Sequence, residues 1–284
     1  MLKLKGVSEC FYPETIEEAV KLLKEGKDSA RIIGGGLHIA AFPNPLIRRL
    51  IFLNNLHLNY VKENEGRVAI GATTTISELI NSGAINYYNG YSIKKVLQSI
   101  ATELLRNQIT IGGSVAQNEP YSDIVTLLAA IRARVLISSG DRESEIPLKE
   151  FYAGNFRETL KHSIIKEIVL EKKGEDFRFG MERFVKNATE IPLLNMGILV
   201  QLSGDTVKDA TIVTGARPGE AEFFTEGEEY LKGRQLSEKN IEIFADFVEE
   251  NINVDTDIRL SKEYRAHIAG VFAKRILTSF LREV

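Results

Sequence analysis

The spacing of apolar residues over the first fifty-odd positions predicts a small βαβ unit. Residues 15–26 repeat apolar side chains at helical intervals, and Thr15 with Glu18 forms a sequence typical of a capping box. The apolar runs at 30–33 and 50–53 are short and rich in isoleucine and leucine, which is typical of buried strands. The helix followed by these two strands predicts a small βαβ-like unit of about fifty residues.

Helical and strand-like patterns continue to the end of the chain and predict an α+β fold. Before the charged stretch at 171–174 we expect strands at 67–70, 134–137 and 164–170, and helices from Thr75 or Ser77, over 93–105 and over 124–131. After it we expect strands at 177–179, 194–202 and 209–214, then helices at 223–231, 237–251 and 261–281. Sheet followed by helices is typical of an α+β domain.

Two glycine-rich segments stand out among these elements. Arg31–His38 follows a predicted strand, Thr110–Ser114 follows a predicted helix, and Asp123 comes after the second segment. Glycine backbone can adopt positive φ and direct consecutive N–H groups into one anion-sized hollow, so two such segments predict one diphosphate held from two sides. The alternatives stay open: each segment can be an ordinary tight turn, and either Ser122 or Asp123 can be the N-cap of the helix at 124–131.

The common nucleotide-binding motifs do not account for these segments. In the dinucleotide fingerprint the third glycine would fall on Ile39, the following helix is interrupted by Pro43 and Pro45, and Asn54 and Asn55 stand where a ribose-binding acid belongs. Neither segment continues into the Gly-Lys-Ser/Thr of a phosphate loop. A dinucleotide bound here requires a different fold.

Composition narrows the class of protein. With 284 residues, 44% hydrophobic residues and a formal net charge of -3, the chain predicts two or three compact units and no electrostatic preference for nucleic acid or an anionic membrane. It contains no apolar run of about 18 residues, so no membrane insertion is expected. The charged start is unlike a secretory signal, and we expect a cytoplasmic protein.

Cysteine and histidine usage argues against metal chemistry within this chain. Cys10 is the single cysteine, so the chain has no internal disulfide and cannot ligate an iron–sulfur cluster alone. The four histidines, His38, His57, His162 and His267, lack metal-ligand spacing. No nucleophile elbow is present, so we assign no metal site and no catalytic residue.

Five segments, in order, resemble the flavin-binding medium subunit of the molybdenum hydroxylases, the family of carbon monoxide dehydrogenase and xanthine dehydrogenase. The segments are Gly34-Gly35 after its strand, Ile70-Gly-Ala-Thr-Thr-Thr75, Arg106-Asn-Gln-Ile-Thr-Ile-Gly-Gly-Ser114, Asn118-Glu-Pro-Tyr-Ser-Asp123, and Ala221 to Gly233 with Ser261 to Gly270. The resemblance implies a two-part FAD-binding domain of the PCMH type, similar to vanillyl-alcohol oxidase. This domain would span residues 1–172, in parts of about 1–55 and 56–172, and a CO-dehydrogenase-flavoprotein-like α+β domain would span 173–284.

The resemblance also implies which residues bind FAD. Backbone amides of the two glycine segments would hold the pyrophosphate, Asp123 would contact the ribityl or pyrophosphate region, Ile100 with Ile164 or Ile165 would border the rings, and Arg183 would lie by the isoalloxazine. The complete cofactor-binding set is Ile32, Ile33, Gly34, Gly35, Gly36, Leu37, His38, Ile100, Thr110, Ile111, Gly112, Gly113, Ser114, Asp123, Ile164, Ile165 and Arg183.

Four positions depart from the family pattern. Leu37 replaces a polar residue of the first segment, Ile109 replaces a glycine, Ser114 replaces an asparagine, and Ile191 stands near a frequent tyrosine. Loss of one neutral hydrogen bond costs about 0.5–1.5 kcal/mol, which predicts weaker or altered FAD binding. His38 is placed to touch a phosphate, and a packed or solvated histidine is the alternative.

The function that this resemblance implies is electron transfer in a larger complex. A molybdenum-cofactor large subunit would oxidise the substrate, and a 2Fe-2S small subunit would pass electrons to this FAD, then to NAD, oxygen or a quinone. The alternatives are a stand-alone flavin oxidoreductase and a non-catalytic scaffold subunit that has lost FAD.

Overall fold

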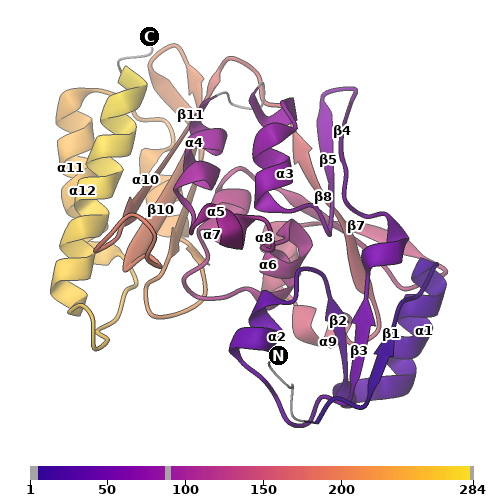
Figure 1. The fold of residues 1–284 in the computed structure, drawn as a ribbon. Helices are drawn as coiled ribbons and strands as arrows, with labels where there is room; N and C mark the ends of the chain where they lie inside the picture. Colours follow the sequence, from indigo (N-terminus) through magenta and orange to yellow (C-terminus); the bar gives the residue numbers. More distant parts are fainter. Residues whose placement is uncertain (1–5, 87–90, 282–284) are drawn as a thin grey trace. The chain divides into compact units, whose positions relative to one another are not determined.

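The computed structural model describes residues 6–86 and 91–281, and the chain forms two compact units that are discontinuous in sequence. The first unit contains Met1–Ala84, Thr102–Gln117 and Ala133–Glu171; the second contains Ile85–Ala101, Asn118–Arg132 and Lys172–Val284 (Figure 1). Both units combine helices and sheets, which confirms the predicted α+β class.

The N-terminal part of the first unit contains the predicted helix and both predicted strands, together with β1, which was not predicted. Its sheet has the order β1-β3-β2, with both strand pairs parallel. Buried residues of helix α1 pack with Ile51 and Leu53 in one apolar cluster. The elements are β1 (Glu9–Phe11), α1 (Ile16–Gly26), a 3-10 helix η1 (Lys27–Ser29), β2 (Ala30–Ile33), α2 (Leu37–Ala41), β3 (Arg49–Phe52) and a 3-10 helix η2 (Asn54–Leu56).

The cap of α1 differs in one detail from the predicted capping box. The Thr15 side chain accepts a hydrogen bond from the Glu18 amide at 3.1 Å, as expected. The Glu18 carboxylate, however, accepts from the amide of Glu14 at 3.0 Å, one residue before the cap.

A second sheet of the first unit is antiparallel, in the order β4-β5-β8-β6-β7. Its strands are β4 (Val61–Asn64), β5 (Arg67–Gly71), β6 (Arg134–Ser138), β7 (Glu143–Pro147) and β8 (Ile164–Glu171). The helices of this part are α3 (Ile76–Asn81), α5 (Glu103–Arg106), α6 (Ile111–Gln117), α8 (Leu148–Ala153) and α9 (Phe156–Thr159). The predicted strands at 67–70, 134–137 and 164–170 are confirmed, whereas the short, polar β4 and β7 were not predicted.

The helix predicted over 93–105 is interrupted. It ends as α4 (Tyr91–Ser99), and α5 starts after Thr102. Ala101 has a positive φ of 49°, and the Thr102 side chain caps α5 by accepting from the Leu105 amide at 3.5 Å. The apolar periodicity continues across this break, but the chain passes there from the second unit to the first.

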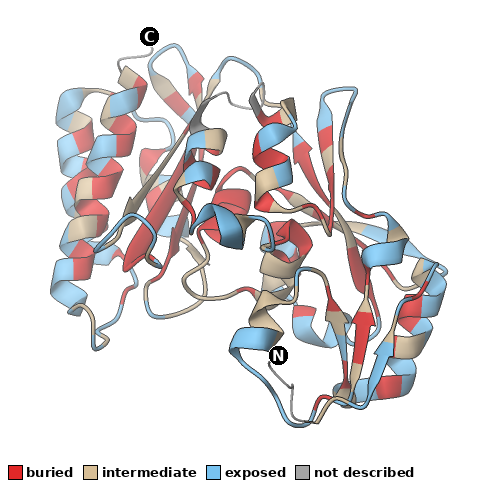
Figure 2. Cartoon of the chain, in the orientation of Figure 1, coloured by how far each residue is buried: buried red, intermediate tan, exposed pale blue. Residues whose placement is uncertain are grey.

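The second unit is a four-stranded antiparallel sheet, β12-β11-β10-β9, with helices on both faces. Alternate residues of β10 separate the two faces: Met196, Ile198 and Val200 belong to the cluster containing residues of α11 and α12, whereas Gly197 faces Ala130 of α7. Figure 2 shows buried positions along β10, α11 and α12. The elements are a 3-10 helix η3 (Ala84–Asn86), which begins at the last residue of the first unit, α4, α7 (Asp123–Ala130), β9 (Phe177–Phe184), β10 (Leu194–Ser203), β11 (Thr206–Gly215), β12 (Glu222–Phe223), α10 (Thr225–Leu231), α11 (Glu238–Asn251) and α12 (Lys262–Leu281).

A fully buried arginine anchors the start of α12. Arg265 is 0% exposed, and its Nε donates to the carbonyl of Leu193 at 3.0 Å. Its guanidinium also donates to the carbonyl oxygens of Asp255 and Leu260 and lies 3.1 Å from the Asp257 carboxylate. Two backbone carbonyls of the segment before α12, together with that of Leu193 before β10, therefore depend on one side chain.

The Asp257 carboxylate should make the second unit sensitive to acid. Partial burial opposes its ionisation, but hydrogen bonds from the Arg259 amide and from Arg265 and Arg259 outweigh burial and lower the pKa of Asp257 to about 2. Because the folded pKa lies below the unfolded value, the stabilisation is complete above about pH 3.8 and is lost as the pH falls towards about 2. Urea unfolding of the parent and of Asp257→Asn over this range should show the acid-dependent loss in the parent and a smaller one in the variant. Equal pH profiles would contradict this assignment.

Within residues 6–86 and 91–281, no helix is long and apolar enough to cross a bilayer.

Candidate functional site

The first glycine segment leaves the carboxyl end of β2 and enters α2. Gly36 has a φ of +77°, a left-handed conformation that favours glycine, and it directly precedes the helix. The predicted positive φ is therefore confirmed at Gly36, and it is not found at Gly34 or Gly35. Carboxyl ends of parallel strands are a common place for ligands in α/β sheets.

Consecutive amides in this segment are available to a ligand. Among the described residues, the N–H groups of Gly34, Gly35, Gly36 and Leu37 donate to no protein oxygen. Gly34, Gly36 and Leu37 are partly buried and Gly35 is exposed, so the amides lie near the surface of the unit. Such a run of N–H groups is suited to a phosphate or another anion.

The second glycine segment has a different structure, because it forms the first turn of α6. Its four amides donate within the protein: Ile111 to the Thr74 carbonyl at 2.9 Å, Gly112 to the Ala72 carbonyl at 2.9 Å, and Ser114 to the Thr110 carbonyl at 3.0 Å. The Gly113 amide donates to the Thr110 hydroxyl at 3.2 Å. The expected positive φ is absent at both glycines. The prediction that these amides hold a diphosphate therefore needs correction, because the N–H groups are already used.

The two segments contact each other directly, and this contact explains their glycines. A Cβ on Gly35 would overlap the Gln108 carbonyl oxygen, and a Cβ on Gly34 would lie 2.8 Å from the Thr110 hydroxyl. In the second segment, a Cβ on Gly112 would lie 2.6 Å from that of Ala72. Side chains at these positions are excluded by protein atoms, so the glycines fix how the segments pack.

Asp123 begins α7 and is buried in the second unit. Ser122, and not Asp123, caps the helix by accepting from the Val125 amide at 3.2 Å. Asp123 Oδ1 accepts from Asn195 Nδ2 at 2.8 Å, and Asp123 Oδ2 lies 2.9 Å from Arg183 Nη2. Helix capping thus does not explain this acid, which instead forms a buried ion pair.

Arg183, Asn195 and Gly215 lie side by side on three neighbouring strands, in one row across the sheet that α7 packs on. Asn195 of β10 is opposite Arg183 of β9 on one side and Gly215 of β11 on the other. Asn195 Oδ1 also accepts from the Thr126 hydroxyl at 2.9 Å, and a Cβ on Gly215 would overlap both of these side chains. This row holds the first turn of α7 on the sheet.

Arg183 joins further segments of the second unit to the same row. Its Nη1 donates to the Ser99 carbonyl at 2.6 Å and its Nη2 to the Glu190 carbonyl at 3.0 Å. Burial raises the pKa of Asp123, while the Arg183 charge and the hydrogen bonds from Asn195 and Arg183 oppose that rise. Both carboxylate oxygens accept a donor, which is the arrangement of an ionised carboxylate.

Most of the apolar residues in the predicted site belong to the protein core. Ile164 is 2% exposed and packs with the core of α1, and Ile33 packs with Ile47 and Leu50. Ile100, Ile111 and Ile165 are also buried. Ile32 is partly buried in β2, and His38 lies in α2 with its ring 5.2 Å from that of Phe42.

The predicted residues therefore form two groups, one in each unit. The first unit brings the two glycine segments together, and the second unit brings Asp123 to Arg183, with Ile100 one residue after Ser99. Sequence reasoning missed Asn195, Thr126 and Gly215. Asn195 could have been noticed, because it interrupts the apolar run from Leu193 to Val200.

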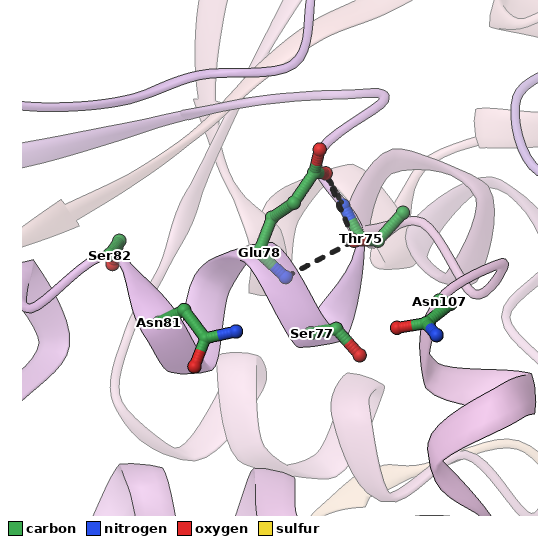
Figure 3. Close-up of a pocket in the computed structure, with 6 residues that line it drawn as sticks. All are labelled: Thr75, Ser77, Glu78, Asn81, Ser82 and Asn107. Atoms are coloured by element: carbon green, nitrogen blue, oxygen red, sulfur yellow. Dashed lines mark hydrogen bonds between the residues drawn. The ribbon is translucent and has the colours of Figure 1, made fainter.

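A polar hollow of the first unit lies beside α3. Its lining consists of Thr75, Ser77, Glu78, Asn81, Ser82 and Asn107 (Figure 3). The carboxylate of Glu78 accepts from the Thr75 amide at 2.8 Å, and the Thr75 side chain accepts from the Glu78 amide at 3.2 Å. This carboxylate is used by the helix cap, and the other lining residues do not titrate near neutral pH.

The residues of the first glycine segment fit the phosphate part of a dinucleotide such as FAD. The observation that carries this fit is the run of amides from Gly34 to Leu37, with the Thr110 hydroxyl packed against Gly34. The donors are neutral, so a bound diphosphate would rely on backbone dipoles.

Comparisons with known proteins agree with this geometry. Residues 5–171 match the family model of the FAD binding domain in molybdopterin dehydrogenase, and residues 181–280 match that of the CO dehydrogenase flavoprotein C-terminal domain. The glyceraldehyde dehydrogenase medium chain of Sulfolobus acidocaldarius is 24% identical over 271 residues, 92% of this chain and 94% of that one. The carbon monoxide dehydrogenase medium chain of Hydrogenophaga pseudoflava is 23% identical over 278 residues, 95% of this chain and 96% of that one.

Solved structures share the fold over nearly the whole chain. A chain of carbon monoxide dehydrogenase from Hydrogenophaga pseudoflava superimposes with a TM-score of 0.88 at 23% identity, covering 97% of this chain and 98% of that one. A chain of quinoline 2-oxidoreductase from Pseudomonas putida gives a TM-score of 0.84 at 21% identity, with 99% of both chains covered.

Fold and site together define an FAD-binding oxidoreductase chain. The chain belongs to the family of FAD binding domains in molybdopterin dehydrogenases, followed by the C-terminal domain of the CO dehydrogenase flavoproteins. The predicted resemblance, fold class and cofactor are thereby confirmed.

Proposed function

We propose that this chain is the FAD-carrying medium subunit of a molybdenum hydroxylase. A molybdenum-cofactor large subunit oxidises the substrate, and a small subunit with 2Fe-2S clusters passes the electrons to this chain, which delivers them to NAD, oxygen or a quinone. The observation that carries the proposal is the pair of family matches, at residues 5–171 and 181–280, on a chain with Cys10 as its single cysteine. One cysteine cannot ligate the clusters, which must therefore reside in a partner.

In this proposal the chain binds and orients FAD, and the flavin supplies the redox chemistry when bound. The amides of Gly34 to Leu37 bind the pyrophosphate, and the Thr110 hydroxyl is the donor that the second segment offers beside them, because the Ser114 hydroxyl already donates to the Thr110 carbonyl. Asp123 contacts the ribityl or pyrophosphate region, and Arg183 lies by the isoalloxazine. Ile100, with Ile164 or Ile165, borders the rings.

Two alternatives make different predictions. A stand-alone flavin oxidoreductase would turn over as a single purified polypeptide, whereas a scaffold subunit would bind no flavin. The available amides of the first segment favour a flavoprotein over the scaffold.

The decisive experiment combines a flavin titration with co-purification. The purified chain is mixed with FAD, and binding is followed by flavin fluorescence and visible absorbance; saturable binding at one FAD per chain is expected. Purification from the native source should recover a molybdenum-containing subunit and an iron–sulfur subunit with it. Failure to bind FAD would exclude the flavoprotein role, and full turnover by the chain alone would exclude the subunit role.

Leu37 offers a test of the first glycine segment. Its apolar side chain provides no hydrogen bond at the proposed pyrophosphate site, so Leu37→Ser should tighten FAD binding by about 2- to 12-fold, which corresponds to about 0.5–1.5 kcal/mol. The control is Leu46→Ser, at an exposed position of the loop before β3. Unchanged or weaker FAD affinity in Leu37→Ser would argue against phosphate contact at this residue.

A further inference from the structure

The buried ion pair of the second unit has a charge balance that bears on the flavin. Asp123 has 3% of its side chain exposed and Arg183 has 14%, so solvent screens neither charge well. The two groups are 2.9 Å apart and carry opposite unit charges. At any point that lies at a similar distance from both groups, the field of the carboxylate offsets much of the field of the guanidinium.

The pair is held rigidly by neutral partners. Asn195 binds Asp123 Oδ1, while the carbonyls of Ser99 and Glu190 accept from Arg183. The three groups in contact with the pair, one side-chain amide and two backbone carbonyls, are neutral. Arg183 Nε is buried and has no hydrogen-bond partner among the described residues, so one N–H donor of the guanidinium is not used by them.

We infer that Asp123 and Arg183 act on the bound flavin as one charge-compensated pair, so that Arg183 does not raise the flavin potential as an isolated cation would. This inference rests on the proposed function, which puts both residues beside FAD. A lone cation there would favour the reduced, negatively charged flavin. With the Asp123 carboxylate paired to it, Arg183 orients the site, and the net charge of the two residues together stays near zero.

The inference predicts effects of opposite sign for the two partners. Removing the Asp123 charge leaves an uncompensated cation and raises the midpoint potential, whereas removing the Arg183 charge leaves an uncompensated anion and lowers it. A purely structural role in holding α7 on the sheet predicts instead that both changes act in the same direction.

The test is a double-mutant cycle on the FAD-loaded chain with the midpoint potential as readout. The variants are Asp123→Asn, Arg183→Gln and the double variant, equilibrated with a reference dye during reductive titration. Each single variant should change the ratio of reduced to oxidised FAD affinity on the order of tenfold, about 30 mV for a two-electron couple. The double variant should return close to the parent potential.

Matched controls separate charge from packing. Asn195→Ala removes a hydrogen bond to Asp123 without changing charge, so it should leave the potential near the parent value even where stability falls. Arg132 and Asp209 form a more exposed ion pair of the same unit, with a distance of 2.7 Å. The same double-mutant cycle applied to this pair should leave the midpoint potential of the flavin unchanged. Arg183→Lys retains the charge and should keep the potential close to that of the parent.

The outcomes distinguish a failure of the proposed function from a failure of the charge-compensated pair. If the parent chain binds no FAD, the proposed function fails. If it binds FAD but the two single variants shift the potential in the same direction, or not at all, the charge-compensated pair is refuted while the proposed function stands. If Arg183→Gln does not fold, Arg183→Lys and Asp123→Asn still decide, because a drop of the potential in either variant would overturn the inference.

Discussion

Gly35→Ala is expected to destabilise the first unit and to abolish tight FAD binding. The new methyl group would overlap the backbone carbonyl oxygen of Gln108, which lies between α5 and α6 and cannot rotate away as a side chain can. Overpacking of this kind costs about 1–3 kcal/mol and more where backbone must move. Urea unfolding of the chain without FAD measures the first effect, and FAD titration measures the second.

The control for this prediction is Gly154→Ala in the same unit. A Cβ at Gly154 would lie 3.5 Å from the Glu150 carbonyl oxygen, an ordinary contact, so a change below about 0.5 kcal/mol is expected. Equal unfolding midpoints for the two variants would show that the contact between the glycine segments is not needed for stability.

Arg265→Met should be the most damaging substitution in the second unit. The arginine is fully buried, and its loss removes the donors for the carbonyls of Leu193, Leu260 and Asp255 together with one partner of Asp257. Removing one member of a buried ion pair costs about 3–5 kcal/mol, and the unpaired carbonyls add to this cost. The free energy of unfolding from urea titration measures the loss.

Arg259→Met is the comparison that isolates burial. Arg259 also pairs with Asp257, at 3.0 Å, but 28% of its side chain is exposed. An ion pair of that exposure contributes about 0–1 kcal/mol, so the variant should be close to the parent. Similar losses in both variants would mean that the Asp257 ion pairs, and not the buried carbonyl contacts, hold the start of α12.

The sequence predicted those elements whose apolar pattern is long and regular. The strand at β10 and the helices α1, α11 and α12 all have such patterns, and their predicted limits lie within a residue of the observed ones. The strands β1 and β7 were missed because Glu9–Phe11 and Glu143–Pro147 show no apolar run. Their pairing depends on neighbouring strands, which the local sequence does not reveal.

The candidate site was predictable in its residue types but not in its hydrogen bonds. Thr110–Ser114 has the composition of a turn, yet it begins a helix because the carbonyls of Ala72 and Thr74 accept its first two amides. Those acceptors come from about forty residues earlier in the chain. Likewise, Asp123 has the spacing of a cofactor contact, and its pairing with Arg183 depends on how β9 and β10 align.

The discontinuity of the units has a consequence for fragment expression and domain recombination. A cut after residue 172 would leave the C-terminal fragment without α7, whose residues Thr126 and Ala130 cover the Asn195 and Gly197 positions of β10. That fragment would expose one apolar side of its central strand and should aggregate when produced alone. Supplying the N-terminal fragment in trans, or a circular permutant that keeps α7 with the sheet, is the expected way to recover a soluble C-terminal unit.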